Sequence, residues 1–523
     1  MTTPAGFALA LLTTLHLAFS ASAAERSITV EQGRIEGAPA RLDGVNAYLG
    51  IPYAAPPVGA LRWQPPALAA AWQGVRAADK PGAGCMQPLA YSRPPWTEPF
   101  MHQGEISEDC LFINIWATAA TPVAPLPVLV YMHGGGFNEG SGNVAVYDGA
   151  ALARRGIIVV TVNYRLGVFG FLAHPELTAE SPHNASGNYG LLDQIAALKW
   201  VKRNIGNFGG DPDNVTIAGQ SAGAMSVYML TASPLAKDLF QRAIVQSGPG
   251  ALASFGMSGI AGMATPRAEA EHAGVAFARS LKVDSIAALR ALPAAALMPQ
   301  QAGPPAVRFG PTVDGWLLAE DLATVYASGM QHDVPMMSGM NADEASAFPG
   351  YGEADTASFA AQVKERYGDA ADRVLALYDT SSDAAAAQAA IALGRDRGLL
   401  GMQWLSALRA RSATTPAYLY YFERAIPWPE YPRFGAFHTA EVPYVFDNLD
   451  LLPRPWTAVD HQLADTTARY WVNFIRTGNP NGEGLPHWPA NSGGAQTLVL
   501  GEQVSAADIP REAVRVLFDN LPD

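Results

Sequence analysis

The chain has 523 residues, of which 49% are hydrophobic and 15% are charged, so it can bury a large core and is not of the disordered class. Its formal net charge is −13. Because phosphate contacts need clustered lysine and arginine, this acidic chain without such a cluster is not expected to bind nucleic acid. Two cysteines are too few for a disulfide scaffold or a cysteine-rich zinc site.

The N-terminal residues are similar to a secretory signal peptide. Residues 7–19 form an apolar run that is too short to span a bilayer, and residues 21–23 (ASA) fit a cleavage site. No lysine or arginine precedes the run, which leaves a misassigned start or a buried N-terminal helix as alternatives. We expect a signal peptide over residues 1–23, a mature chain over 24–523 without a membrane span, and an exported protein, secreted or periplasmic.

Export would permit a disulfide bond, and Cys85 and Cys110 are the only pair available to form one. In the loop-entropy description, a bridge between them contributes about 3 kcal/mol to stability. The alternative is a pair of free, buried thiols.

Apolar segments alternate with helical segments through the middle of the chain. The apolar segments are short and often end at glycine, and helical spacing of apolar residues lies between them. The predicted strands cover residues 127–132, 156–164, 215–218, 243–246 and 334–338, and the predicted helices cover residues 149–154, 191–203 and 222–230. This alternation predicts an α/β fold with a mostly parallel central sheet flanked by helices.

Two alanine-rich segments, residues 267–300 and 381–412, have helical patterns and no strand signal. No linker or repeat marks a domain boundary. We therefore expect a single domain, with helical cap insertions near residues 250–330 and 350–430.

A candidate nucleophile, Ser221, lies at the centre of the motif 219–223 (GQSAG), between a predicted strand and a predicted helix. This context makes G-x-S-x-G informative, because it presents the serine on a sharp turn. Glycines at positions 219 and 223 permit close approach of the neighbouring elements. The helix that follows offers free N–H groups and a positive dipole end to a developing oxyanion.

A serine hydroxyl needs a general base, and on this kind of fold the chain order is serine, acid, histidine. His438, His461 and His487 follow Ser221 with room for an acid between them. His461 lies in a helical pattern, which favours a solvated face. His487 lies between proline and tryptophan, which favours a packed loop. His438 follows a short loop at 434–437 (FGAF) and is the preferred base.

The acid is expected in a loop that follows a strand. Asp343 and Glu344 follow the predicted strand at 334–338, and Asp314 follows another short apolar run. The residues alone do not separate these three carboxylates, because each is also typical of a turn or a helix cap.

Backbone donors for an oxyanion are expected after the strand at 127–132. The segment 133–137 (HGGGF) follows this strand, and its glycines allow consecutive amides to point one way and a substrate to approach closely. His133 precedes the serine in the chain, so a structural role is favoured over a catalytic one.

Taken together, these motifs resemble the type-B carboxylesterases of the α/β-hydrolase superfamily, which implies the α/β-hydrolase fold. The resemblance covers nearly the whole mature chain. Its most specific stretches are Leu49–Trp63 (LGIPYAAPPVGALRW), Ser107–Trp116 (SEDCLFINIW), Tyr131–Phe137, Asn163–Pro175 (NYRLGVFGFLAHP), Gly187–Val227, Gln246–Gly248 and Tyr470–Asn481 (YWVNFIRTGNPN).

The resemblance implies roles that the spacing leaves open. Residues 339–344 match the turn and acid motif of the family, so Glu344 is implied as the acid, and His438 falls on the histidine motif. Ala345 stands where the family has a glycine, a departure that could alter this loop. Ser247 falls where the family has a serine that supports the histidine.

The resemblance also implies the oxyanion donors, which are the amides of Gly135, Gly136 and Ala222. Cys85 and Cys110 match the first disulfide of the family, which supports their pairing.

These residues predict a serine hydrolase that cleaves small-molecule carboxylic esters through an acyl-enzyme, with no metal or organic cofactor. The alternatives are a lipase or a hydrolase of a multi-ester natural product. A non-catalytic binding protein of the same fold is disfavoured because all three triad positions are filled.

Substrate choice is less well defined by the sequence. The cholinesterase branch has a tryptophan shortly before the Ser-Glu-Asp-Cys stretch, but the nearest one here, Trp96, lies in a different, proline-rich segment, so a choline ester is not expected. Aromatic residues crowd 418–434, which suggests a gorge wall or ordinary packing. The sequence does not define the oligomeric state.

Overall fold

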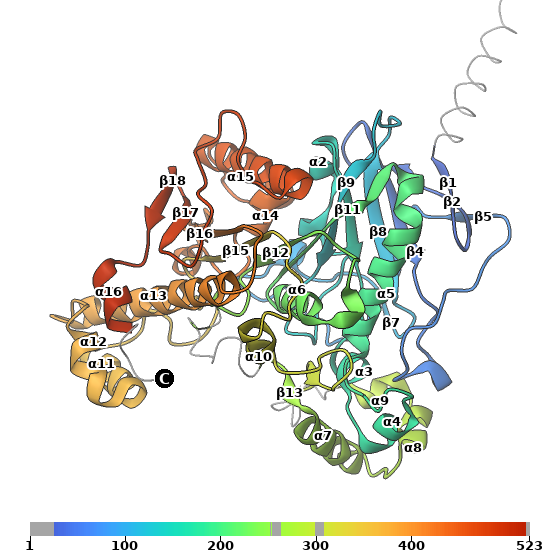
Figure 1. The fold of residues 1–523 in the computed structure, drawn as a ribbon, viewed down its shortest axis with the longest axis horizontal. Helices are drawn as coiled ribbons and strands as arrows, with labels where there is room; N and C mark the ends of the chain where they lie inside the picture. Colours follow the sequence, from blue (N-terminus) through green and yellow to red (C-terminus); the bar gives the residue numbers. More distant parts are fainter. Residues whose placement is uncertain (1–25, 91, 252, 254–262, 299–307, 519–523) are drawn as a thin grey trace, which may run out of the picture.

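The computed structural model describes residues 26–90, 92–251, 253, 263–298 and 308–518 (Figure 1). The signal peptide expected over residues 1–23 lies outside this range. Within it, no helix has both the length and the apolar character that crossing a membrane requires.

One large sheet runs through the described part of the chain, where its eleven strands lie in the order β18-β17-β16-β15-β12-β11-β9-β10-β8-β4-β3 (Figure 1). The strands from β17 to β10 are parallel to their neighbours, whereas the strands at both edges are antiparallel. The bounds are β3 (Ala38–Pro39), β4 (Val45–Pro52), β8 (Phe112–Thr118), β9 (Leu126–Met132), β10 (Ile158–Val162), β11 (Gly210–Gln220), β12 (Arg242–Gln246), β15 (Met336–Asn341), β16 (Ala417–Phe422), β17 (Gln496–Leu500) and β18 (Val504–Asp508). The predicted α/β fold is confirmed, and the antiparallel edges were not predicted.

The sheet separates two hydrophobic cores. Along β9, Val128, Val130 and Met132 face one core, while Leu129 and Tyr131 face the other, because side chains alternate along a strand. Helices α5 (Tyr189–Asn204) and α6 (Ala222–Ala232) pack into the first core, and helices α2 (Ala150–Arg154), α14 (Val442–Val445) and α15 (Ala458–Thr477) pack into the second. Because both faces are covered, the inner strands are continuously apolar, which made them recognisable in the sequence.

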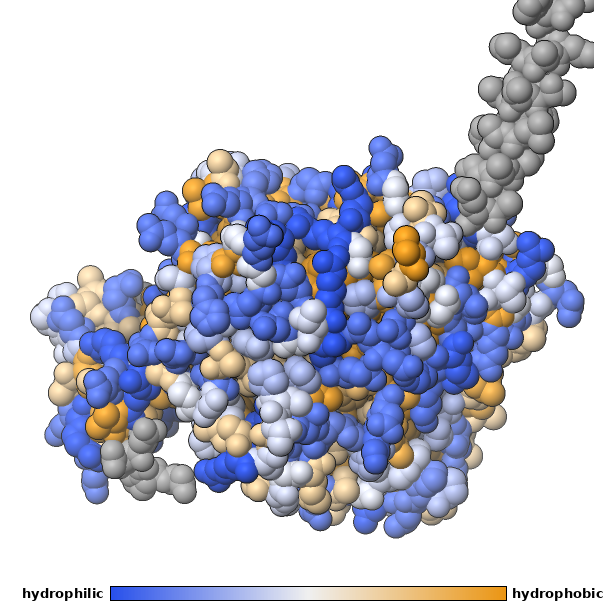
Figure 2. Space-filling view, turned by 45° about the horizontal axis from the view of Figure 1, so that its top comes forward, coloured by the Kyte–Doolittle hydropathy of each residue, from blue (hydrophilic) through white to orange (hydrophobic). Residues whose placement is uncertain are grey.

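The outer surface is of a different character. On the face shown in Figure 2, hydrophilic residues predominate and hydrophobic residues are scattered among them. This is the surface expected of a chain whose apolar side chains are gathered in two covered cores.

Helices from two long segments lie beside the sheet, towards the bottom and the left of Figure 1. They are α7 (Arg267–Ser280), α8 (Ile286–Ala291), α9 (Ala294–Leu297) and α10 (Leu322–Ala327) from the first segment, and α11 (Thr356–Tyr367), α12 (Ala371–Leu375) and α13 (Asp383–Ala410) from the second. Helices α11 to α13 share a small core around Phe359, Val374 and Leu393. These helices fall in the ranges where cap insertions are expected, and the division into one domain with two insertions stays a prediction.

The aromatic segment 418–434 begins inside the main sheet. Its first residues belong to β16, in which every residue from Ala417 to Phe422 is buried. The sequence does not predict this strand, because the segment falls within the second expected helical insertion. The aromatic side chains of β16 pack in the second core, which favours the packing interpretation.

Cys85 and Cys110 form the predicted disulfide bond, with their Cα atoms 4.9 Å apart. Cys85 ends β6 (Gly84–Cys85), which pairs with β7 (Ile106–Ser107). Just after the bridge, Gln87 accepts a hydrogen bond from the Gly140 N–H at 2.8 Å and donates one to the Gly140 carbonyl at 2.9 Å. The bridge therefore closes a loop that is also fixed to the segment following β9.

Several shorter elements complete the described part of the chain. They are β1 (Ser27–Val30), β2 (Gly33–Glu36), β5 (Val75–Ala77), β13 (Thr265–Pro266), β14 (Thr312–Val313), α3 (Gly167–Phe171), α4 (Pro175–Glu180) and α16 (Glu512–Phe518). Strands β1, β2 and β5 form a small separate sheet, as do β13 and β14.

Candidate functional site

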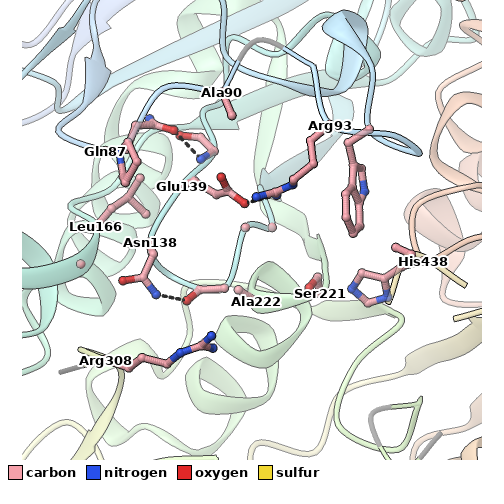
Figure 3. A pocket seen from close by; sticks show the side chains of 18 of the residues that line it. Gln87, Ala90, Arg93, Asn138, Glu139, Leu166, Ser221, Ala222, Arg308 and His438 are labelled. Carbon is pink, nitrogen blue, oxygen red and sulfur yellow. Dashed lines mark hydrogen bonds and ion pairs between the residues drawn. The ribbon is translucent and has the colours of Figure 1, made fainter. Parts of the chain in front are cut away.

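A cavity of about 1710 Å³ lies at the carboxyl ends of the parallel strands. The loop after β9 contributes Gly134–Gly136 to its wall, the turn after β11 contributes Ser221, and the loop after β15 contributes Glu344. His438 lines the same cavity (Figure 3). In open α/β sheets, ligands bind at this edge of the sheet. The residues that the sequence singled out for chemistry therefore meet in one place.

Ser221 lies on a sharp turn between β11 and α6. Its backbone has φ 58° and ψ −121°, a conformation that residues other than glycine rarely adopt. The junction is tight, because a Cβ atom at Gly223 would lie 2.0 Å from the carbonyl oxygen of Met132. The Ser221 N–H donates a hydrogen bond to the carbonyl of Gln246 at 2.9 Å, which ties the turn to β12. The turn predicted from the G-x-S-x-G motif is present.

The glycine-rich loop after β9 lies directly against this turn. A Cβ atom at Gly134 would lie 3.1 Å from the Ser221 Cβ. Gly135 and Gly136 have φ values of 111° and 62°, which an L side chain would strain. The Asn138 side chain donates a hydrogen bond to the Gly136 carbonyl at 2.6 Å and so holds the loop in this conformation.

Ala222 is the first residue of α6, so its N–H belongs to the helix start, where amides lack intrahelical partners. It lines the cavity beside the glycine loop (Figure 3). The structure thus brings all three residues whose amides were expected as oxyanion donors to the wall around Ser221.

His438 and Glu344 are joined by a hydrogen bond between Nδ1 of the imidazole and Oε2 of the carboxylate. The other carboxylate oxygen, Oε1, accepts the backbone N–H of Asn341 at 2.8 Å. The carbonyl of His438 accepts a hydrogen bond from the Gln220 side chain at 2.7 Å. The Glu344 side chain is 1% exposed, so the carboxylate is held in one orientation away from water. Figure 3 shows the imidazole next to the Ser221 side chain.

The other two carboxylates that the sequence left open have different partners. Asp343 accepts hydrogen bonds from Arg395 and Tyr351, both at 2.6 Å, and from the Ala436 N–H at 2.8 Å. Asp314 accepts the backbone N–H groups of residues 316–318. Of the three, Glu344 is the carboxylate that hydrogen-bonds His438.

Electrostatics around His438 favour its charged form. Burial lowers the pKa of His438, but the neighbouring Glu344 and Glu441 carboxylates raise it, and the net direction is upward. Burial also raises the pKa of Glu441 itself, from 4.5 to about 7. Glu441 accepts hydrogen bonds from the side chains of Asn341 at 2.5 Å and Gln246 at 3.1 Å.

Glu441 is therefore a second buried carboxyl group close to the histidine, and it was not predicted from the sequence. Its position three residues after His438 was the available signal. An acidic residue at such a position is also common on solvated surfaces, so only the fold reveals that it is fully buried.

The remaining polar residues named from the sequence lie as follows. His133 is buried, stacks on Tyr164 with ring centroids 4.3 Å apart, and has a pKa lowered to about 4 by burial, which fits the structural role expected for it. Ser247 is buried at the end of β12, and its hydroxyl has no hydrogen-bond partner within the described residues. His461 is exposed on α15, as expected, whereas His487 is exposed and not packed.

The Carboxylesterase family profile matches residues 24–513. The chain belongs to the carboxylesterase family. It is 38% identical over 501 residues to fumonisin B1 esterase of Sphingopyxis macrogoltabida, covering 91% of this chain and 87% of that protein. It is 36% identical over 504 residues to para-nitrobenzyl esterase of Bacillus subtilis (strain 168), and the match covers 93% of this chain and 97% of that protein. The family resemblance and the predicted carboxylic-ester hydrolase are confirmed.

Proposed function

We propose that this carboxylesterase hydrolyses its ester with Ser221 as nucleophile, His438 as general base and acid, and Glu344 as the carboxylate that orients the histidine. The observation that carries the proposal is the buried hydrogen bond from His438 to Glu344, next to Ser221 on its strained turn. Glu344 fixes Nδ1 as the protonated nitrogen, so Nε2 is the unprotonated nitrogen that accepts the serine proton.

The reaction then proceeds in two halves. Ser221 Oγ attacks the ester carbonyl as His438 takes its proton, and the imidazolium returns that proton to the departing alcohol. Water enters, is deprotonated by the same histidine and attacks the acyl-serine, which releases the acid and restores the hydroxyl. The raised pKa of His438 supports the imidazolium that both halves require.

The negative oxygen of each tetrahedral intermediate is assigned to the amides of Gly135, Gly136 and Ala222. Support comes from their place on the cavity wall and from the positive φ values of the two glycines, which turn the loop towards the serine. Each such donor is worth about 2.7–4 kcal/mol of barrier lowering in enzymes of this kind.

The natural substrate is proposed to be a bulky ester. The cavity volume of about 1710 Å³ exceeds the roughly 300–1,000 Å³ of ordinary small-molecule sites. A relative named for fumonisin B1 points in the same direction, towards a natural-product ester. The Trp96 ring already carries the Arg93 guanidinium 5.3 Å from its centroid, which disfavours a quaternary ammonium on that face.

The experiment is an ester panel run on the wild type and on Ser221→Ala. We expect the wild type to release alcohol in a burst from an activated aryl ester, and Ser221→Ala to lose both the burst and the turnover. The panel includes fumonisin B1 and small acetate esters, and the bulkier esters are expected to have the lower KM. Full turnover by Ser221→Ala would remove the nucleophile from the proposal, and equal KM values across the panel would remove the size preference.

Export is proposed on the basis of the N-terminal sequence and is compatible with the disulfide bond. N-terminal sequencing of the protein recovered from periplasm or medium tests it. A mature chain that begins at residue 24 is the expected result, and an intact residue 1 in the cytoplasm would contradict it.

A further inference from the structure

The cavity wall carries several ionisable side chains, and most of them are matched by an opposite charge. Arg93 pairs with Glu139 at 2.6 Å, and both line the cavity. Arg395 lines the cavity and pairs with Asp343, also at 2.6 Å. His438 is matched by Glu344.

Arg308 is the exception among the described lining residues. Its guanidinium has no ion pair or hydrogen bond within the described part of the chain, although it lines the cavity. Figure 3 shows its side chain projecting into the cavity below Asn138. A cation left without a counter-charge inside a concave site attracts an anionic ligand, because low-dielectric walls focus its field.

Arg308 shares the cavity wall with apolar side chains. The next residue, Phe309, lines the cavity and contacts Phe277 of α7 with ring centroids 5.1 Å apart. Leu281 and Met298 line the same cavity. Arg308 itself is exposed, so its charge-assisted contact with an anionic ligand would be partly screened by salt.

The position of Arg308 relative to the proposed catalytic groups indicates whether it faces the acyl part or the alcohol part of the ester. In Figure 3, Arg308 and His438 lie on opposite sides of Ser221. The departing alcohol must lie near His438, because it takes its proton from the imidazolium. The acyl group therefore extends away from His438, towards Arg308.

We propose that Arg308 binds a carboxylate carried by the acyl part of the substrate. This inference rests on the proposed function, because it uses the assignment of His438 to the alcohol side. The substrate class is then the half-esters of dicarboxylic or polycarboxylic acids. Hydrolysis adds one water and yields the free polycarboxylic acid and the alcohol, so no further reactant is needed.

The test compares monoethyl esters of glutaric, adipic and suberic acids with ethyl alkanoates of the same chain length, with acid release followed in a pH-stat. The quantity of interest is the ratio of kcat/KM for the charged ester to that for its neutral partner. Arg308→Gln is expected to lower this ratio about tenfold or more at the best chain length, which is the size of one lost charge-assisted contact. Arg308→Lys, which keeps the charge, is expected to retain part of the ratio.

Three controls make the outcome specific. Arg373→Gln removes an exposed arginine that does not line the cavity, and it should leave the ratio unchanged. Added salt should lower the wild-type ratio and have less effect on that of Arg308→Gln. An acetate ester whose carboxylate lies in the alcohol part should respond little to Arg308→Gln.

The results that overturn the inference differ from those that overturn the proposed function. An Arg308→Gln ratio equal to that of the wild type at every chain length would remove Arg308 from substrate binding. If Arg308→Gln lowered kcat/KM equally for the acetate ester whose carboxylate lies in the alcohol part, Arg308 would not be specific for a carboxylate on the acyl part. If either of these two results were obtained while Ser221→Ala lost all turnover, the further inference would fail but the proposed function would stand.

Discussion

Glu344→Gln tests the electrostatic role of the carboxylate with little change in shape. In the wild type, Glu344 Oε2 accepts from His438 Nδ1 and Oε1 accepts the Asn341 N–H. The amide keeps one acceptor oxygen but loses the negative charge. If the oxygen stays on Asn341, an N–H group faces Nδ1 and favours the tautomer that cannot take the serine proton at Nε2.

The size of the effect follows from burial. The side chains of Glu344 and His438 are 1% and 11% exposed, so their interaction is not that of a screened surface pair. Two unit charges about 4 Å apart at an effective dielectric constant of about 20 attract by about 4 kcal/mol. Since about 1.36 kcal/mol corresponds to a factor of ten, Glu344→Gln is expected to lower kcat/KM about a thousandfold.

The pH profile of kcat/KM gives a second, independent readout. Glu344 raises the pKa of His438 while burial lowers it, so removing the carboxylate charge must lower that pKa. Because His438 is proposed to act as a base in its neutral form, the acid limb of the profile should move to lower pH as the plateau falls. Asp343→Asn serves as the control, since its carboxylate bonds Arg395 and not His438. A Glu344→Gln enzyme within tenfold of wild type and with an unmoved acid limb, or a larger loss in Asp343→Asn, would refute the reasoning.

Three further predictions concern stability, each measured as the free energy of unfolding in urea. Gly223→Ala places a Cβ atom 2.0 Å from a backbone carbonyl oxygen of β9 and should lower the free energy of unfolding by about 3 kcal/mol or more. Gly206→Ala, where nothing lies within 4 Å of the added Cβ atom, should lower it far less. Equal losses in the two variants would contradict the steric argument. Replacing both Cys85 and Cys110 by alanine should cost about 3 kcal/mol, and reductant should destabilise only the wild type. Folding favours the protonated form of Glu441, so this group stabilises the fold fully below pH 4.5, and the stabilisation is lost as pH rises to about 7. Glu441→Gln should therefore remove about 3 kcal/mol of the pH dependence of the free energy of unfolding in that window. Identical pH dependence in the wild type and the variant would refute this prediction.

The turn that carries the proposed nucleophile, Ser221, could be predicted from the sequence because its signal is local. Ser221 and the glycine loop at 134–136 each follow an apolar strand, and the residues that define their turns are adjacent in the chain. The acid could not be separated in the same way. Asp343 and Glu344 are neighbours, and what distinguishes them is that Arg395, from α13, engages the first. A contact between residues so far apart in sequence leaves no local pattern.

Other features depended on burial and pairing that only the fold defines. Strand β16 has the aromatic composition of a strand, but the proline-rich residues after it and the helical segment before it obscured its start. Arg308 was not singled out from the sequence because its lack of a counter-charge depends on where the fold places the carboxylates.

The groups proposed to act on the ester bond and the groups that surround the rest of the substrate come from different parts of the architecture. Ser221, Glu344 and the glycine loop follow the ends of the parallel strands β11, β15 and β9, whereas Phe277 and Leu281 belong to the segment around α7, outside the sheet. Replacements in that helical segment can therefore change which acyl groups bind without moving the residues proposed to cleave the ester bond. An engineer seeking a new specificity in this enzyme should randomise the helical wall and leave the strand ends untouched.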